Sequence, residues 1–285
     1  MKTAIVTGAN GGIGQQLTEA LANAGFRVIM ACRNKETSDC ICSQIKEKTN
    51  CDSIGVMELD LASFSSIRQF VKEFQSQYGK LDVLLNNAGV LCHYPEKTKE
   101  DVEYSIGVNY LGTYILTELL HSMMHKETKV INTGSLMMRY GKINSNFFQF
   151  NPSGFNRFKN YSDSKLAIYY ATLDWAEKWK NEEITVNCVD PGIVSTNMIR
   201  MGNKYIDKLC DIFFRPFIRT PKQGTDTILH LIFDKENERI TGQIFKNRKI
   251  KQISLALQES VQRKLLKKET EEFLTNYPIG YEVSF

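Results

Sequence analysis

Four glycines within seven positions mark the stretch Thr7-Gly8-Ala9-Asn10-Gly11-Gly12-Ile13-Gly14, which follows a short apolar run and leads into a segment with helical periodicity. Glycines let the backbone turn tightly and come close to a pyrophosphate, and the first N–H groups of a helix attract its negative charge. The strict G-x-G-x-x-G spacing is not met, because Leu17 stands where the third glycine would be. We interpret the stretch as a phosphate-binding turn. A tight strand-to-helix turn without a ligand is the alternative.

Short β-branched apolar runs alternate along the chain with longer segments of helical periodicity, which is typical of a parallel sheet with crossover helices. Strands are predicted at Lys2–Val6, Arg27–Ala31, Ser53–Glu58, Leu81–Leu85, Lys129–Thr133, Ile184–Val189 and near Gln243–Phe245. Helices are predicted at Gly12–Ala24, Lys35–Lys48, Ser63–Gln77, Lys99–His125, Asn160–Lys180 and Pro221–Phe233. We therefore expect an α/β protein with a doubly wound Rossmann-type fold, in which about seven parallel strands carry helices on both faces.

No shift in composition divides the chain, so residues 1–285 are expected to form a single domain. Two long segments, residues 136–159 and 193–220, interrupt the alternation after the carboxyl ends of predicted strands. Open α/β sheets bind their ligands at that edge, so these segments are the predicted substrate loops. The tail, residues 253–277, has a helical pattern with lysines on its polar positions. We expect a docked helix there, and a helix that contacts a membrane surface or a partner is the alternative.

The composition is that of a globular enzyme, since 42% of the residues are hydrophobic, 24% are charged and only six are prolines. A formal net charge of +4, evenly spread, does not indicate a nucleic-acid partner. Seven cysteines without a C-x-x-C pair are expected to be reduced, and His121 and His125 lack a third ligand, so no metal site is predicted. Neither a signal peptide nor a transmembrane segment is apparent, and the expected location is cytoplasmic.

Arginine stands at the end of the second predicted strand, in Ala31-Cys32-Arg33-Asn34, where a side chain would touch the ribose of a dinucleotide. An acidic residue at this place accepts a hydrogen bond from the 2′-hydroxyl of NAD, whereas an arginine pairs with the 2′-phosphate of NADP. Arg33 therefore predicts NADP(H), preferred over NAD(H). A solvent-exposed arginine without a ligand is the alternative.

Tyr161 and Lys165 lie four residues apart on one face of a predicted helix, and Ser135 stands at the end of the strand before it. A free tyrosine has a pKa of about 10 and is a poor base at neutral pH, but a neighbouring cation favours the phenolate. We therefore expect Lys165 to lower the pKa of Tyr161 and Tyr161 to act as the general acid and base. An ordinary pair of helix residues is the alternative.

Seven ordered motifs make the chain resemble the short-chain dehydrogenase/reductase family from Met1 to about Asn247. They are T-G-x-x-x-G-x-G at residues 7–14, Asp60-Leu61, Asn86-Asn87-Ala88-Gly89, Asn109, Ser135, Tyr161 to Lys165, and Pro191-Gly192. Within the family the chain is most similar to the retinol-dehydrogenase-like branch. The residues that carry this narrower resemblance are Ala31 to Asn34, the 26-residue step from Ser135 to Tyr161, and Thr220 to Thr227 leading to Thr241-Gly242. The chain departs from the pattern at Gly134, where many members carry a second serine.

The resemblance implies a role for each catalytic position: Tyr161 is the acid and base, Ser135 holds the substrate oxygen, Lys165 binds the nicotinamide ribose, and Asn109 holds a proton-relay water. The turn, Arg33 and the resemblance together predict the cofactor-binding residues Gly8, Asn10, Gly11, Gly12, Ile13, Gly14, Arg33, Asp60, Leu61, Asn87, Ala88, Gly89, Tyr161, Lys165, Pro191, Gly192, Val194 and Thr196. Family members often pair through the helices predicted at Lys99–His125 and Asn160–Lys180, so a homo-oligomer is one expectation.

These observations predict an NADP(H)-dependent oxidoreductase that transfers a hydride between the nicotinamide and a small apolar molecule, as a carbonyl reductase or alcohol dehydrogenase does. The second substrate loop contains the apolar residues Phe213, Phe214, Pro216, Phe217 and Ile218, which favour an apolar aldehyde, ketone or alcohol. A place for these residues in the hydrophobic core is the alternative. A catalytically silent nucleotide-binding regulatory protein on the same fold is the main alternative. A dehydratase or an epimerase is a third interpretation.

Overall fold

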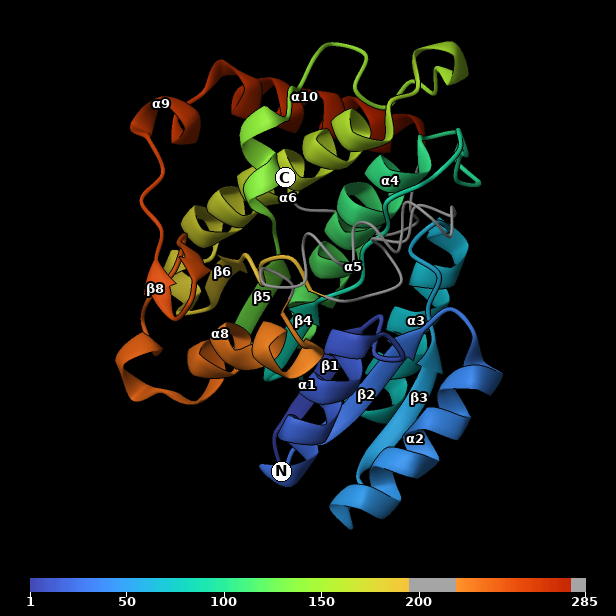
Figure 1. The fold of residues 1–285 in the computed structure, drawn as a ribbon, viewed down its shortest axis with the longest axis vertical. Coiled ribbons are helices and arrows are strands. Elements are labelled where there is room, and N and C mark those ends of the chain that lie inside the picture. Colours follow the sequence, from blue (N-terminus) through green and yellow to red (C-terminus); the bar gives the residue numbers. More distant parts are fainter. Residues whose placement is uncertain (195–218, 278–285) are drawn as a thin grey trace.

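A computed structural model describes residues 1–194 and 219–277 of the chain. These residues form an eight-stranded sheet between two layers of helices (Figure 1), in the strand order β3-β2-β1-β4-β5-β6-β7-β8. The strands are β1 (Thr3–Thr7), β2 (Arg27–Cys32), β3 (Ile54–Glu58), β4 (Val83–Asn86), β5 (Lys129–Thr133), β6 (Thr185–Val189), β7 (Ile244–Lys246) and β8 (Lys249–Ile250). The predicted Rossmann-type fold is thus confirmed. The sheet has one strand more than expected, because β8 is a two-residue strand that pairs antiparallel with β7.

The helices follow the strands in the predicted order. They are α1 (Gly12–Asn23), α2 (Lys35–Thr49), α3 (Phe64–Gln77), α4 (Tyr104–Ile106), α5 (Thr113–Leu120), α6 (Arg157–Lys178), α8 (Pro221–Phe233), α9 (Leu255–Gln258) and α10 (Val261–Asn276). A π-helical segment, Gly107–Gly112, joins α4 to α5. The helix predicted at Lys99–His125 starts later than expected. Lys97 and Glu103 form an antiparallel bridge, Asp101 has a φ of 62°, and the Glu103 carboxylate caps the helix at Ile106 N.

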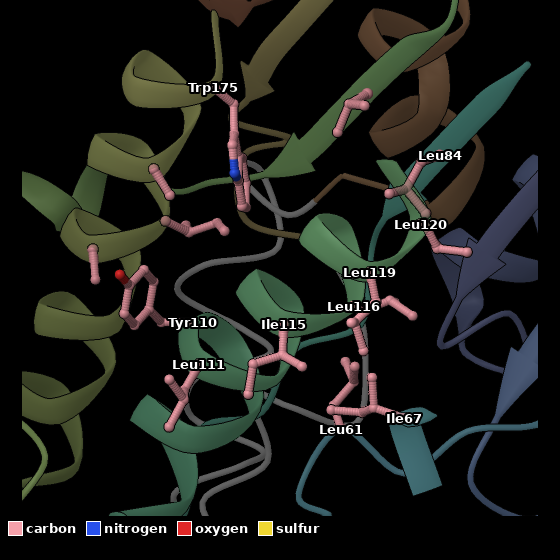
Figure 2. Close-up of a cluster of buried hydrophobic side chains, with 14 of the residues drawn as sticks. Leu61, Ile67, Leu84, Tyr110, Leu111, Ile115, Leu116, Leu119, Leu120 and Trp175 are labelled. Atoms are coloured by element: carbon pink, nitrogen blue, oxygen red, sulfur yellow. The ribbon is translucent and has the colours of Figure 1, made fainter. Parts of the chain in front are cut away.

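Alternating strand residues fill two separate hydrophobic layers. In β1, Ile5 faces the layer formed with α3, α5 and α6, whereas Ala4 and Val6 face the layer formed with α1, α2 and α8. Figure 2 shows the first layer, in which Ile115 and Leu116 of α5 lie between the sheet, α3 and α6. Both faces of the sheet are therefore buried, and its ligand-binding edge is the row of strand carboxyl ends.

The tail forms a docked helix, as predicted. Helix α10 lies along α6 (Figure 1) and buries Leu266 and Leu274. Arg263 Nε donates to Asp174 Oδ1 of α6 at 2.6 Å. Thus α10 occupies part of the surface of α6. The sequence analysis expects two copies of the chain to associate through this helix, and that association stays a prediction. Among the described helices, none combines the length and the hydropathy needed to cross a membrane.

The first predicted substrate loop is partly folded. It contains the short helical turns Leu136–Tyr140 and Pro152–Gly154, and Phe147 and Phe148 are buried against the protein. Most of the second predicted loop, with Phe213, Phe214 and Phe217, lies outside the described residues.

Candidate active site

The glycine turn places the start of α1 directly against the end of β1. A Cβ atom at Gly14 would overlap Gly8 O and would lie 2.6 Å from Ala9 Cα, so only glycine allows this packing. The N-cap of α1 is Gly11, which has no side chain that could accept the N–H groups of the first turn. Gly11 is exposed, and Asn10, Gly12 and Ile13 are partly exposed. The first N–H groups of α1 are therefore accessible to phosphate oxygens, and the turn fits a dinucleotide.

Thr7 fastens the turn to the segment after β4. Its Oγ1 accepts from the backbone N–H groups of Asn87 at 3.0 Å and Ala88 at 2.9 Å. The Asn87 side chain also donates to Thr7 O at 2.9 Å. A Cβ at Gly8 would lie 3.0 Å from Ala88 Cα, so the two segments are in contact at the point where the strand order reverses. The structure thus brings Asn87, Ala88 and the turn together, as predicted.

Ser135, Tyr161 and Lys165 meet at the carboxyl end of β5. The hydroxyl groups of Ser135 and Tyr161 are hydrogen-bonded to each other. Lys165 is 3% exposed, its Nζ donates to Thr133 O at 2.7 Å, and the same atom lies 5.6 Å from the centre of the Tyr161 ring. Two hydroxyl donors side by side, with a cation near one of them, can bind a carbonyl oxygen and exchange a proton with it.

Burial controls the titration of both α6 residues. It raises the pKa of Tyr161 to about 12; the hydrogen bond with Ser135 opposes this rise, and the charge of Asp190 adds to it. Burial also lowers the pKa of Lys165 to about 8. The prediction that the pKa of Tyr161 is lowered is therefore wrong in direction. Removing water from a phenolate costs more free energy than the hydrogen bond with Ser135 contributes, so the pKa rises.

Asn109 lies in the π-helical segment and links α6 to the segment after β4. Its Oδ1 accepts from Val90 N at 2.7 Å, and its Nδ2 donates to Val90 O at 2.9 Å and to Ser164 Oγ at 3.0 Å. Ser164 Oγ in turn donates to Tyr161 O at 2.7 Å. The Asn109 side chain thus holds the backbone beside Tyr161. Its predicted role in binding a water stays a prediction.

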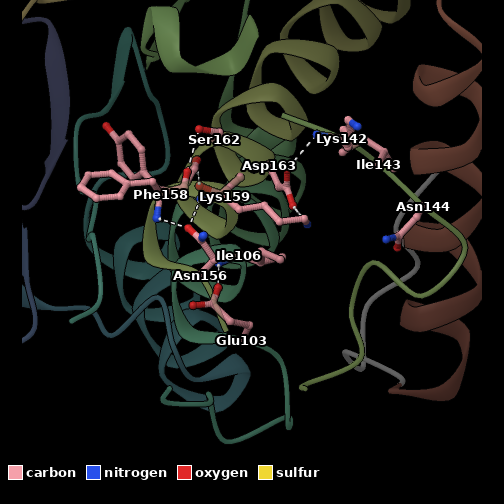
Figure 3. A network of polar contacts seen from close by, with 12 residues as sticks. Glu103, Ile106, Lys142, Ile143, Asn144, Asn156, Phe158, Lys159, Ser162 and Asp163 are labelled. Carbon is pink, nitrogen blue, oxygen red and sulfur yellow. Dashed lines mark hydrogen bonds and ion pairs between the residues drawn. The ribbon is translucent and has the colours of Figure 1, made fainter. Parts of the chain in front are cut away.

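The first substrate loop is anchored to the N-terminal part of α6 (Figure 3). Asp163 is buried and accepts from Lys142 N at 2.7 Å and from Lys159 Nζ at 2.5 Å. Asn156 caps α6 by accepting from Phe158 N and Lys159 N. The loop is therefore fixed at both ends of residues 142–159, next to Tyr161.

The predicted adenosine end of the site contains Arg33, Asp60 and Leu61. Arg33 is exposed at the end of β2, and its Nη1 donates to Tyr104 Oη at 2.6 Å. Asp60 Oδ1 accepts from Ala62 N at 2.9 Å. Leu61 packs in the hydrophobic layer of Figure 2, and its predicted contact with the cofactor stays a prediction.

The nicotinamide end is described only in part. Gly192 N donates to Asp190 Oδ1 at 3.0 Å, and Arg219 Nη1 donates to Pro191 O at 3.4 Å. Val194 is buried and forms a parallel bridge with Arg219. Thr196, predicted to lie along the nicotinamide, is outside the described residues. Gly89 follows Ala88 directly and is partly exposed.

Three residues near the site were missed by the sequence analysis. Buried Asp190 pairs with Lys246 Nζ at 2.9 Å, and Tyr104 holds Arg33. The position of Asp190 directly before Pro191-Gly192, at the end of a predicted strand, could have indicated it. The contacts of Lys246 and Tyr104 join elements that are far apart in the sequence, and no sequence pattern indicates them.

The histidines expected not to bind metal contact acidic side chains instead. His121 Nε2 is 2.8 Å from Glu182 Oε2, and His125 Nε2 is 3.1 Å from Asp82 Oδ1. Among the described residues, one group of three potential metal ligands lies near the end of α8: His230, Asp234 and Glu236. None of these belongs to the predicted site.

Comparison with known proteins gives consistent matches. Residues 2–205 match the family model described as short chain dehydrogenase. The chain is 35% identical to mouse (Mus musculus) retinol dehydrogenase 14, a match that covers 93% of this chain and 83% of the relative. It is 34% identical to human (Homo sapiens) retinol dehydrogenase 11 with the same coverage, and 32% identical to human retinol dehydrogenase 13, over 88% of this chain and 77% of the relative.

Solved structures share the fold at lower identity. An uncharacterised protein from Mycobacterium paratuberculosis superposes with a TM-score of 0.76 at 23% identity, over 96% of this chain and 94% of the other. A short-chain dehydrogenase from Shigella flexneri, complexed with NADP, has a TM-score of 0.67 at 24% identity, over 87% of this chain and 97% of the other.

The glycine at position 134 is explained by a sulfur atom on the neighbouring strand. A Cβ at Gly134 would overlap Cys188 Sγ. We expect Gly134→Ser to lower the free energy of unfolding by about 1–3 kcal/mol, because the side chain overpacks a buried site. In a Cys188→Ala background the same substitution should cost clearly less. Urea unfolding of the four proteins measures the coupling, and an equal loss in both backgrounds would show that Cys188 is not the cause.

The lowered pKa of Lys165 predicts a pH-dependent contribution to stability. Between pH 8 and 10.5 the folded lysine is neutral while the unfolded one is still protonated, so unfolding takes up a proton. Stability of the natural protein relative to Lys165→Met should therefore rise with pH across this range, by up to about 3 kcal/mol. Urea unfolding at several pH values tests this, with Lys126→Met, at a largely exposed lysine, as the control. A difference that does not change with pH would contradict the prediction.

Proposed function

The chain belongs to the short-chain dehydrogenase/reductase family, and from this premise we propose that it is an NADP(H)-dependent oxidoreductase that interconverts an apolar carbonyl compound and its alcohol. Members of this family are oxidoreductases that use a nicotinamide cofactor.

The observation that carries the proposal is the hydrogen bond between Ser135 and Tyr161, with the Lys165 ammonium 5.6 Å from the tyrosine ring. A nicotinamide cofactor, when bound, supplies or accepts the hydride. In the direction of reduction, the hydroxyls of Ser135 and Tyr161 donate hydrogen bonds to the carbonyl oxygen, where negative charge develops. Tyr161 then gives its proton to that oxygen. A pKa of about 12 keeps the phenol protonated at neutral pH, so Tyr161 holds the proton that this step requires.

Lys165 has two functions in this proposal. It is charged below pH 8, so at neutral pH it stabilises the phenolate that Tyr161 becomes when its proton leaves. Its side chain is also fixed by Thr133 O, which holds the ammonium at the end of β5, where the ribose of the cofactor would lie. Replacement by an uncharged residue would remove both.

The choice of NADP(H) is supported by the end of β2. Arg33 is exposed there, and the residues around it, Ala31, Cys32 and Asn34, provide no carboxylate for a ribose 2′-hydroxyl. A guanidinium with free N–H groups suits a 2′-phosphate. The apolar substrate is supported by the names of the relatives, retinol dehydrogenases at 32–35% identity.

Removal of the Tyr161 hydroxyl tests the chemistry. We expect Tyr161→Phe to reduce turnover at least about 100-fold while the affinity for NADPH stays within about twofold, because the substitution removes the proton donor but no phosphate contact. Oxidation of NADPH is followed with apolar aldehydes and ketones, retinal among them. Tyr94→Phe, the same change at a 73% exposed tyrosine outside the predicted substrate loops, is the control.

Two outcomes would count against the proposal. Turnover that survives in Tyr161→Phe would exclude Tyr161 as the acid and base. Tight binding of NADPH by the natural protein without turnover of any compound would favour the regulatory protein named above as the alternative.

Removal of the Arg33 guanidinium tests the choice of cofactor. We expect Arg33→Ala to raise the Kd for NADPH by about tenfold or more, because a charge-assisted contact is lost, and to leave the Kd for NADH almost unchanged. Titration followed by nicotinamide fluorescence measures both constants. Arg239→Ala, at an exposed arginine beyond α8, is the matched control. An unchanged ratio of the two constants would refute the proposed preference.

A further inference from the structure

Tyr104 forms a hydrogen bond with Arg33, the residue that we have proposed to bind the 2′-phosphate, although 71 residues separate the two in the sequence. We propose that Tyr104 is a positioning residue that determines the preference for NADP(H), because it holds the Arg33 side chain in the orientation that receives the phosphate. This inference rests on the proposed function, since it presupposes that Arg33 binds that group.

Arg33 needs a partner in order to stay in one place. An exposed arginine has many rotamers, and fixing them costs conformational entropy when a ligand binds. The 2.6 Å hydrogen bond from Nη1 to Tyr104 Oη fixes one end of the guanidinium before any ligand arrives. Part of the entropy cost is therefore met in the free protein, and the affinity for a phosphate at this position rises accordingly.

Tyr104 is itself held firmly. It is the first residue of α4, its N–H donates to Glu96 O at 3.0 Å, and its ring packs against the hydrophobic layer beneath. The residue before it, Glu103, is buried and caps the same helix through Ile106 N. Tyr104 thus presents its hydroxyl from a fixed helix end, whereas the side chain of Arg33 extends from the end of a strand.

The contact leaves donors free for a ligand. The guanidinium has five N–H groups and gives one of them to Tyr104 in this bond. Burial raises the pKa of Tyr104, against the opposing effect of Arg33, so the residue stays a neutral phenol. Its oxygen accepts from Arg33, and its own proton remains to be donated. A 2′-phosphate beside Arg33 would therefore meet two adjacent donors, whereas a 2′-hydroxyl would gain little from either.

The experiment deletes only the hydroxyl. In Tyr104→Phe we expect the Kd for NADPH to rise about three- to tenfold, because one hydrogen bond to a charged group is lost, with the Kd for NADH changed less than about twofold. The affinity for 2′,5′-ADP, which carries the 2′-phosphate without the nicotinamide, should fall by the same factor. Tyr94→Phe, at a 73% exposed tyrosine, is the control, and thermal unfolding verifies that each variant folds.

The double variant identifies the route of the effect. If Tyr104 acts through Arg33, Tyr104→Phe should change the Kd for NADPH less than about twofold in an Arg33→Ala background. A further loss there would overturn the proposed route. An equal loss for NADPH and NADH would show a structural role, and tighter binding of NADPH would show that Tyr104 competes with the phosphate for Arg33. Either result would overturn the inference.

The two single variants separate an error about Tyr104 from an error about the cofactor. If Arg33→Ala lowers the preference for NADPH and Tyr104→Phe does not, the inference about Tyr104 is wrong and the proposed cofactor stands. If Arg33→Ala leaves the preference unchanged, the proposed cofactor choice is wrong, and the inference is wrong with it.

Discussion

A single threonine fastens the carboxyl end of β1 to the segment after β4, and both ends of the site depend on that junction. Thr7 accepts from the backbone of Asn87 and Ala88, and its carbonyl accepts from the Asn87 side chain. The strand order reverses here, and open α/β sheets bind their ligands at such a point. Because Thr7 is buried and makes three of these bonds, the glycine turn has one defined position relative to the neighbouring strand.

A chain of hydrogen bonds connects this junction with the backbone of Tyr161. Asn109 bonds both backbone groups of Val90, three residues after Asn87, and its Nδ2 reaches Ser164, whose hydroxyl bonds Tyr161 O. Polar side chains thus connect the phosphate turn with the first turn of α6. Catalysis requires a general acid that is fixed relative to the cofactor, and this connection fixes it through regular elements of the fold.

Features that are determined by residues close together in the sequence were predictable from the sequence. Strand β5 and helix α8 have the predicted bounds, because β-branched runs and a Thr-Pro helix start are local signals. The two-residue strand β8 has no such signal. The late start of α4 follows from the buried Glu103 cap, which sequence periodicity does not reveal. Gly134 was noted as a departure, but its cause, Cys188, comes from the adjacent strand and becomes visible only in the fold.

The pKa of Tyr161 is another feature that depends on the folded surroundings and that the sequence pattern does not reveal. The spacing of Tyr161 and Lys165 correctly predicts that the two lie together, and from that proximity one expects a lowered tyrosine pKa. Burial reverses the sign, since both charged forms lose water. A phenol that keeps its proton is ready to donate it, and a buried ammonium beside it favours the anion left behind. The same pair serves both directions of the reaction, because the group that gives a proton to the alkoxide in reduction takes it from the alcohol in oxidation.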